Sequence, residues 1–255
     1  MTLESSFYDA TAPLYVAAMG TELVAPLLYD LARLTRPQRL LEVGMGYTTP
    51  FLARALHDAR IDAYAEAKAL ATKGIPTPAS RAKLNDKWLE RHPTFASPAF
   101  HAAPYEPQLV VLDDFSVERS SATSVLPILK SLELDDLVVP VHSSLQDIHT
   151  SLDPKLTPFD FVWVDAWACL YFFENCWDLV SDPGGIALFH YLIGYEEGDA
   201  IIDYMKATQQ MHPDELEILS LIEPHKLRQN SLTLVRRIAS RGNSKTSRST
   251  GDAAS

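Results

Sequence analysis

Short apolar runs alternate along this chain with longer segments in which apolar residues recur every three or four positions. Short runs bounded by turn residues are typical of buried strands, whereas the longer pattern is typical of amphipathic helices. Strands that alternate with helices indicate an α/β protein with a mostly parallel sheet. The expected strands are 40–43, 108–113, 137–141, 159–165, 186–191, 216–223 and 231–238, and the expected helices are 23–34, 51–57, 61–72, 81–91, 117–130, 166–179 and 198–211.

The most informative segment is Leu40–Thr49, where an apolar run ends at Glu42 and is followed by Gly44, Gly46 and hydroxyl residues. Glycines let the backbone pass close to a ligand, and the start of the next helix offers free N–H groups. Nucleotide-type cofactors bind at such turns, at the carboxyl edge of an open α/β sheet. The alternative is a strand–turn–helix unit whose glycines serve only the turn.

A dinucleotide is disfavoured at this turn because the third glycine of its fingerprint is missing after Gly46. A pyrophosphate also gains nothing from the carboxylate of Glu42, which suits an ammonium or sulfonium ligand instead. The segment resembles the first motif of the class I S-adenosylmethionine-dependent methyltransferases, an acidic residue followed by x-Gly-x-Gly. A second likeness, Phe-Asp-x-Val-x-x-Asp, a helix and Pro-Gly-Gly, covers 159–191, and the whole resemblance covers roughly 37–57 and 107–238.

This resemblance implies an α/β fold with a seven-stranded, mostly parallel, Rossmann-like sheet and helices on both faces. In the family, an acid after the second strand accepts the ribose hydroxyls and the next apolar residue lies against the adenine. Asp114 followed by Phe115 fits that order best, Asp113 is the second choice, and an ordinary pair of strand-end acids is the alternative. The residues expected to hold S-adenosyl-L-methionine are Glu42, Gly44, Gly46, Thr48, Asp113, Asp114, Phe115, Ser144 and Asp165.

The candidate catalytic residues are Asp165, Tyr171 and His190, which follow the fourth and fifth strands. Both strand ends face the cofactor crevice in this fold. His190 is a candidate general base because imidazole titrates near neutral pH, and a core or surface histidine is the alternative. Catechol-type relatives hold magnesium with an acid after strand four and an Asp-Asn pair after strand five. Asp165 fits the first position but His190-Tyr191 does not supply the second, so no metal site is expected.

Two segments outside the strand–helix series are candidates for enclosing the site. Residues 1–36 form an expected N-terminal helical cap, in which Tyr8 and Tyr15, together with Tyr191 elsewhere, are candidate substrate contacts. Aromatic packing of a helix onto the sheet is the alternative. Residues 58–106 form a long helical insertion after the first strand–helix unit. Insertions of this length are often functional, so we expect a lid over the site, with surface elaboration or a dimer contact as the alternative.

Composition narrows the functional class. The net charge of −11 over 255 residues disfavours nucleic acid as a partner. No apolar run approaches membrane-spanning length, and Met1–Asp9 has no basic residue, which disfavours a secretory signal. Cys169 and Cys176 lie seven positions apart on one expected helix and cannot form a disulfide there. A reducing, cytoplasmic location is therefore expected.

Together these features predict one domain over 1–239 with a disordered tail over 240–255, and a homodimer is a candidate assembly. The expected function is metal-independent methylation of a small metabolite on an N, O or activated C atom, an activity of class EC 2.1.1. One alternative is a cyclase of the same fold that makes azetidine-2-carboxylate and releases methylthioadenosine. Another is a non-catalytic partner subunit. The product formed from S-adenosylmethionine alone distinguishes the first two.

Overall fold

The structure is a computed structural model that describes residues 3–72, 100–117, 121–165, 169–225 and 231–238. Its centre is a seven-stranded sheet in the order β3-β2-β1-β4-β5-β7-β6. β7 is antiparallel to both β5 and β6, and the other six strands run in one direction. The strands are β1 (Arg39–Val43), β2 (Gln108–Asp113), β3 (Val138–His142), β4 (Phe161–Val164), β5 (Ile186–His190), β6 (Leu216–Ile222) and β7 (Ser231–Arg237).

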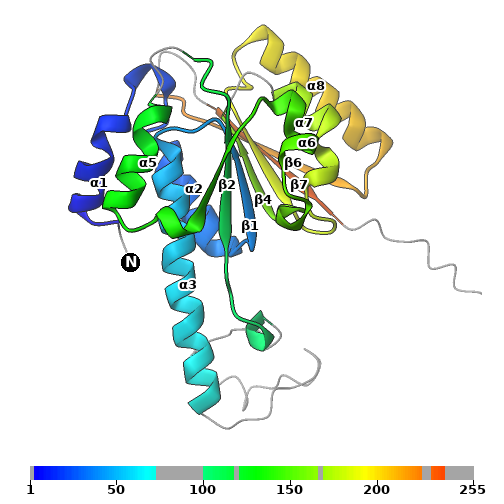
Figure 1. The fold of residues 1–255 in the computed structure, drawn as a ribbon. Coiled ribbons are helices and arrows are strands. Elements are labelled where there is room, and N and C mark those ends of the chain that lie inside the picture. The colour runs from blue at the N-terminus through cyan, green and yellow to red at the C-terminus, as the bar shows by residue number, and fades with distance from the viewer. Residues whose placement is uncertain (1–2, 73–99, 118–120, 166–168, 226–230, 239–255) are drawn as a thin grey trace, which may run out of the picture.

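Helices cover both faces of this sheet (Figure 1). One face carries α1 (Ser5–Thr11), α2 (Val24–Thr35), α3 (Thr48–Thr72) and α5 (Ala122–Ser131). The other carries α6 (Ile148–Ser151), α7 (Cys169–Asn175) and α8 (Glu196–Met211). Short 3-10 helices complete the described chain: η1 (Ala12–Leu14), η2 (Ala17–Met19), η4 (Phe100–Ala102), η5 (Asp135–Leu137), η6 (Leu145–Asp147), η7 (Pro154–Leu156) and η8 (Trp177–Leu179). The α/β architecture expected from the sequence is confirmed.

Two apolar cores result because successive side chains of a strand point to opposite faces. Leu40 of β1 belongs to the core under α2 and α3, whereas Leu41 belongs to the core under α7 and α8. β1, β2, β4 and β5 are buried along nearly their whole length. Continuous apolar runs therefore mark strands that are covered on both sides.

Several expected element boundaries differ from the structure. The segment from Phe51 to Thr72 is part of one continuous helix of 25 residues, because nothing between the two expected parts breaks the helix. The helix expected from Val117 begins only at Ala122. The fourth strand begins at Phe161 rather than Phe159, since Phe159 makes only an isolated bridge.

The described ends of the insertion lie away from the glycine turn, and the lid expected over 58–106 stays a prediction. A helix that follows a parallel strand runs back toward the amino edge of the sheet, and 25 residues span about 37 Å. In Figure 1, α3 extends past the amino ends of the strands, on the side away from the turn. Tyr105 also lies at this edge, because its hydroxyl donates a hydrogen bond to the carbonyl oxygen of Pro37. Residues 73–99, including the helix expected at 81–91, lie outside the described residues.

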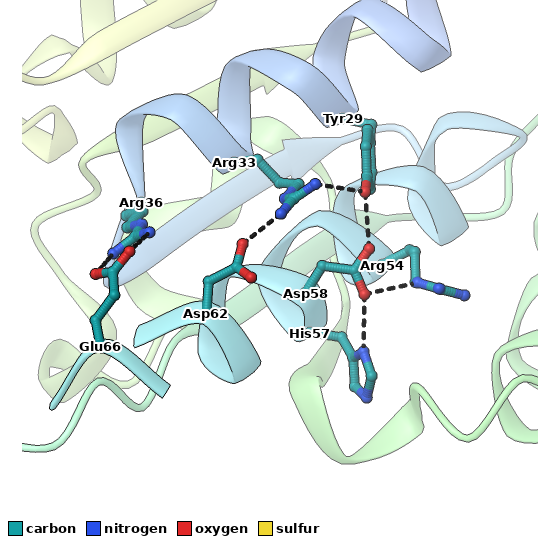
Figure 2. A network of polar contacts seen from close by, with 8 residues as sticks. All are labelled: Tyr29, Arg33, Arg36, Arg54, His57, Asp58, Asp62 and Glu66. Atoms are coloured by element: carbon teal, nitrogen blue, oxygen red, sulfur yellow. Dashed lines mark hydrogen bonds and ion pairs between the residues drawn. The ribbon is translucent and has the colours of Figure 1, made fainter. Parts of the chain in front are cut away.

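A ladder of polar contacts joins α2 to α3 (Figure 2). The Tyr29 hydroxyl donates to Asp58 Oδ2 at 2.7 Å, and burial, with the hydrogen bond to Asp58 and its charge, raises the pKa of Tyr29 to about 12. Further along, Arg33 pairs with Asp62, and Arg36 makes two contacts with Glu66 at 2.7 and 2.8 Å. This ladder fixes the projecting half of α3 on the body of the domain.

Candidate functional site

Four of the residues singled out from the sequence form one row across the carboxyl edge of the sheet. The row consists of Asp113, Gly44, Asp165 and His190. These residues lie side by side because those that precede them on β2, β1, β4 and β5 are paired in register: Leu112, Val43, Val164 and Phe189. Because side chains alternate along a strand, these positions share the sheet face that carries α2 and α3.

Gly44 has a structural role that the sequence did not reveal. A Cβ atom at this position would lie 2.7 Å from the carbonyl oxygen of Asp165, and its φ of +96° is a conformation that favours glycine. At Gly46, by contrast, a Cβ atom would meet only Ser121 Oγ, at 3.7 Å. The first glycine therefore lets β1 and β4 end side by side, and the second leaves the turn open.

A hollow of ≈ 130 Å³ lies over this turn. Its wall includes Gly44–Tyr47, the acids Asp113 and Asp165, and residues of the N-terminal segment. The described residues that line it include no lysine or arginine. A larger groove of ≈ 630 Å³ lies between α8 and β6, but none of the residues expected to form the site lines it.

Of the two acids after β2, Asp113 faces the hollow. Its Oδ2 accepts a hydrogen bond from the backbone N–H of Met45 at 2.7 Å, and its Oδ1 accepts one from Phe115 at 2.6 Å. Asp114 does not line the hollow; its Oδ1 accepts a hydrogen bond from the Ser116 N–H at 2.9 Å. Hydrogen bonding to Ser116 lowers the pKa of Asp114. The structure thus brings the second-choice acid to the turn.

Asp165 and His190 form a pair. His190 Nδ1 donates to Asp165 Oδ1 at 2.6 Å. The imidazole is only 1% exposed, whereas the carboxylate is 24% exposed and lines the hollow. The imidazole stacks on Tyr191, with 3.7 Å between ring centroids, and lies beside Trp163. Asp165 therefore meets the hollow, and His190 lies behind it.

Glu42 lies beneath the turn rather than in the wall of the hollow. It is completely buried, and its Oε1 accepts a hydrogen bond from Thr48 Oγ1 at 2.5 Å. Its Oε2 is buried without a hydrogen-bond partner among the described residues. Burial raises the pKa of Glu42 to about 8, against the opposing effect of hydrogen bonds from Thr48 and Thr49.

The aromatic candidates occupy different places. Tyr171 is on α7 and packs against the core on the opposite face of the sheet, away from the hollow. Tyr8 packs edge-on against Phe7 and Phe51. The Tyr15 ring contacts that of Tyr47, which lines the hollow.

The remaining candidates lie near the same edge. Tyr191 adopts a φ of +61°, and burial raises the pKa of its hydroxyl. Within the described part of the chain, this buried hydroxyl has no hydrogen-bond partner. Ser144 donates to Asp147 Oδ2 at the start of η6, and the Phe115 ring is edge-on to His142 at 5.0 Å.

Thr21 was missed from the sequence. It lines the hollow and is 3% exposed, and its hydroxyl is buried without a partner among the residues described. No motif surrounds it, so only the fold of the N-terminal segment over the turn reveals its position.

Within the described ranges, no group of three or more His, Cys, Asp or Glu residues is arranged to hold a metal ion. None of the helices with described residues is long and apolar enough to cross a membrane.

No family model matches the sequence, and no curated protein matches it. Solved structures do match. The O-methyltransferase TomG from Streptomyces achromogenes, solved with SAM, is 20% identical, with 93% of this chain and 91% of that chain covered and a TM-score of 0.57. An O-methyltransferase from Bacillus cereus, solved with SAH, is 17% identical, with 92% of each chain covered and a TM-score of 0.57. The SAH-bound methyltransferase PaMTH1 from Podospora anserina is 15% identical, with 93% and 89% covered and a TM-score of 0.56. This chain has the fold of the class I S-adenosylmethionine-dependent methyltransferases.

Proposed function

We propose that this protein is an S-adenosylmethionine-dependent methyltransferase that acts on a small molecule. The observation that carries the proposal is the placing of Asp113 and Asp165 on either side of Gly44, in one hollow. S-adenosylmethionine has a ribose diol, which a carboxylate binds as acceptor, and positively charged sulfonium and ammonium groups. A hollow whose described lining contains two acids and no lysine or arginine suits that ligand and repels a pyrophosphate.

The described residues fit this cofactor. Asp113 already accepts two backbone N–H groups, but a carboxylate has about four lone-pair sites, so it retains capacity for the ribose hydroxyls. The Thr21 hydroxyl is buried at the wall and lacks a partner among the described residues. Such a group is costly unless a ligand or water satisfies it. Asp165 and the backbone at Gly44 and Gly46 would face the charged end of the ligand.

For the reaction, we favour transfer to a hydroxyl oxygen of the acceptor. When bound, S-adenosylmethionine supplies an electrophilic methyl group on a positively charged sulfur. Asp165 is placed to accept a hydrogen bond from the acceptor, and His190 fixes the orientation of that carboxylate through the 2.6 Å contact. The O-methyltransferase activity stated for TomG and the Bacillus cereus protein supports this choice by analogy.

The proposal also covers the surroundings of the site. The N-terminal segment acts as a cap, because Leu14, Val16, Met19 and Thr21 line the hollow. Residues 1–239 would form one domain. The net charge of −11 favours a small-molecule acceptor over nucleic acid.

A second candidate is a cyclase that converts S-adenosylmethionine alone into azetidine-2-carboxylate and methylthioadenosine. In that reaction a bond forms between the amine nitrogen and the γ-carbon, the carbon–sulfur bond breaks, and the amine proton leaves. The burial of His190 favours this candidate, because the wall then presents a carboxylate but no exposed imidazole. Such a site has little means of activating a separate weak acid.

Incubation of the full chain with S-adenosylmethionine, with and without a panel of small hydroxyl and amine compounds, tests these proposals. S-adenosylhomocysteine that forms only with an acceptor supports the methyltransferase. Methylthioadenosine formed without any acceptor contradicts it and supports the cyclase. Tight cofactor binding with neither product from any compound would favour the non-catalytic subunit instead.

A further inference from the structure

The feature that leads beyond this proposed function is the carboxyl group of Glu42. It is 0% exposed, and its Oε1 accepts a hydrogen bond from the Thr48 hydroxyl at 2.5 Å. The other oxygen is buried with no partner in the described part of the chain. An isolated buried carboxylate is strongly disfavoured relative to the neutral acid. The geometry alone therefore favours a protonated Glu42 in the empty protein.

The groups packed around Glu42 strengthen this conclusion. Asp165 at the end of β4 and Asp113 at the end of β2 are the charged groups that act on it, and both raise its pKa. From α3 it meets the hydroxyls of Thr48 and Thr49, and its register partner on β4 is Trp163, which is uncharged. The ion pairs that lysines and arginines form in the described part of the chain involve other acids.

Glu42 is also close to the hollow. It lies two residues before Gly44, directly beneath the row that joins Asp113 and Asp165. Gly44 carries no side chain, so this position of the turn adds none between the Glu42 carboxyl and the hollow. A positive charge above the turn therefore interacts with Glu42 through a poorly screened interior. A unit charge at about 7 Å, with an effective dielectric constant of about 20, shifts a carboxyl pKa by roughly one to two units.

We propose that Glu42 holds a proton in the empty site and releases it when the sulfonium form of the cofactor binds. The O–H bond of the neutral acid breaks, the proton passes to the solvent, and the carboxylate that remains faces the cation. S-adenosylhomocysteine has a neutral sulfur, so its binding leaves the proton on Glu42. Glu42 thus determines specificity for the charged cofactor over the neutral product. The inference rests on the proposed function, because it requires this cofactor in the hollow.

Calorimetry with the full chain tests the inference. Each ligand is titrated at pH 7.5 in two buffers of different ionisation enthalpy, which gives the number of protons released. The ligands are S-adenosylhomocysteine, S-adenosylmethionine and sinefungin, which carries an amine in place of the methylsulfonium and cannot react. For a pKa that falls from about 8 by the shift estimated above, we expect the charged ligands to release roughly 0.5–0.7 proton more than S-adenosylhomocysteine.

Glu42→Gln is the matched variant, because an amide keeps an acceptor for Thr48 and mimics the neutral acid. The excess proton release should disappear in this variant, and its preference for sinefungin over S-adenosylhomocysteine should lose its pH dependence. In the wild type that preference should rise with pH, by up to about tenfold per pH unit between the lowered pKa in the charged complex and the pKa in the free protein. An excess that is absent from the wild type, or that persists in Glu42→Gln, overturns the inference while leaving the cofactor assignment intact.

Two further outcomes separate this inference from the proposed function. If none of the three ligands binds, the cofactor assignment itself fails, and the role of Glu42 fails with it. If Glu42→Gln does not fold, infrared difference spectra of the wild type replace it. Sinefungin should remove a protonated-carboxyl band that S-adenosylhomocysteine leaves in place, and identical spectra with the two ligands would contradict the inference.

Discussion

The backbone N–H of Met45 donates a hydrogen bond to Asp113 Oδ2 at 2.7 Å and thereby joins the turn after β1 to the end of β2. The two residues are 68 positions apart in the sequence. The contact fixes one carboxylate beside the glycine turn, where it lines the hollow. The following acid, Asp114, is held by Ser116 outside the hollow. This difference between adjacent residues leads to the first prediction.

Asp113→Asn should weaken S-adenosylhomocysteine binding, because the amide loses the charge and one acceptor toward the ribose diol. The expected loss is about 1–3 kcal/mol, or roughly 5- to 150-fold in Kd. Asp114→Asn is the matched control and should change Kd less than about twofold. Calorimetry on both variants measures this. A larger change in Kd for Asp114→Asn than for Asp113→Asn would indicate that Asp114, which the sequence favoured, contacts the ribose.

His190→Phe should lower turnover more than cofactor affinity, because it removes the donor that orients Asp165. Loss of one buried, charge-assisted hydrogen bond predicts a decrease of roughly 10- to 100-fold in kcat. His190→Gln keeps an N–H group on a side chain of similar reach and should recover part of the rate. Steady-state kinetics, read as separate kcat and KM values, checks this. Equal rates in the Phe and Gln variants would show that the contact with Asp165 has no positioning role.

Gly44→Ala should destabilise the protein, whereas Gly46→Ala should not. The added Cβ at Gly44 would lie 2.7 Å from the Asp165 carbonyl oxygen at a φ of +96°, while that at Gly46 has only a 3.7 Å contact. Backbone strain of this kind costs about 1–3 kcal/mol, and the clash adds to it. Urea unfolding of both variants provides the measurement. Similar losses of unfolding free energy at the two glycines would contradict this account of the turn.

Glu42→Gln should change how stability depends on pH. The folded protein keeps the proton on Glu42 up to about pH 8, whereas an unfolded glutamate loses it near 4.5. Between these values the folded state binds more protons, so the wild type loses up to about 1.4 kcal/mol of stability for each unit of rising pH. The variant has no titrating group there. Its unfolding free energy relative to the wild type should therefore increase from pH 5 to pH 8, as urea unfolding at several pH values would reveal. A constant difference would mean that Glu42 does not titrate in this range.

Turnover should persist in EDTA. His190 and Tyr191 follow β5, where the magnesium-dependent relatives have an oxygen-bearing Asp-Asn pair, and an imidazole buried against Asp165 is a poor ligand for a hard cation. Product formation before and after chelation is the measurement. Activity that is lost with EDTA and restored by magnesium would show that this prediction is wrong.

The sequence by itself determined the alternation of strands and helices, because a strand buried on both faces must be a continuous apolar run. It also located the turn, since Glu42, Gly44 and Gly46 form a local pattern whose geometry needs no distant partner. Adjacent strand ends likewise identified Asp165 and His190 as neighbours of the turn. These features depend on short-range chemistry that can be read along the chain.

Only the tertiary structure decided which groups meet. Asp113 rather than Asp114 reaches the turn because of a hydrogen bond across 68 residues, and Gly44 is required by the approach of Asp165 from another strand. The direction of α3 places the described ends of the insertion at the edge opposite the hollow. The length of the insertion alone had suggested a lid over the hollow. The burial of Glu42 and His190, and the place of Thr21 in the wall, result from packing between distant segments. Such contacts depend on the relative placement of whole elements, which no local pattern of residues encodes.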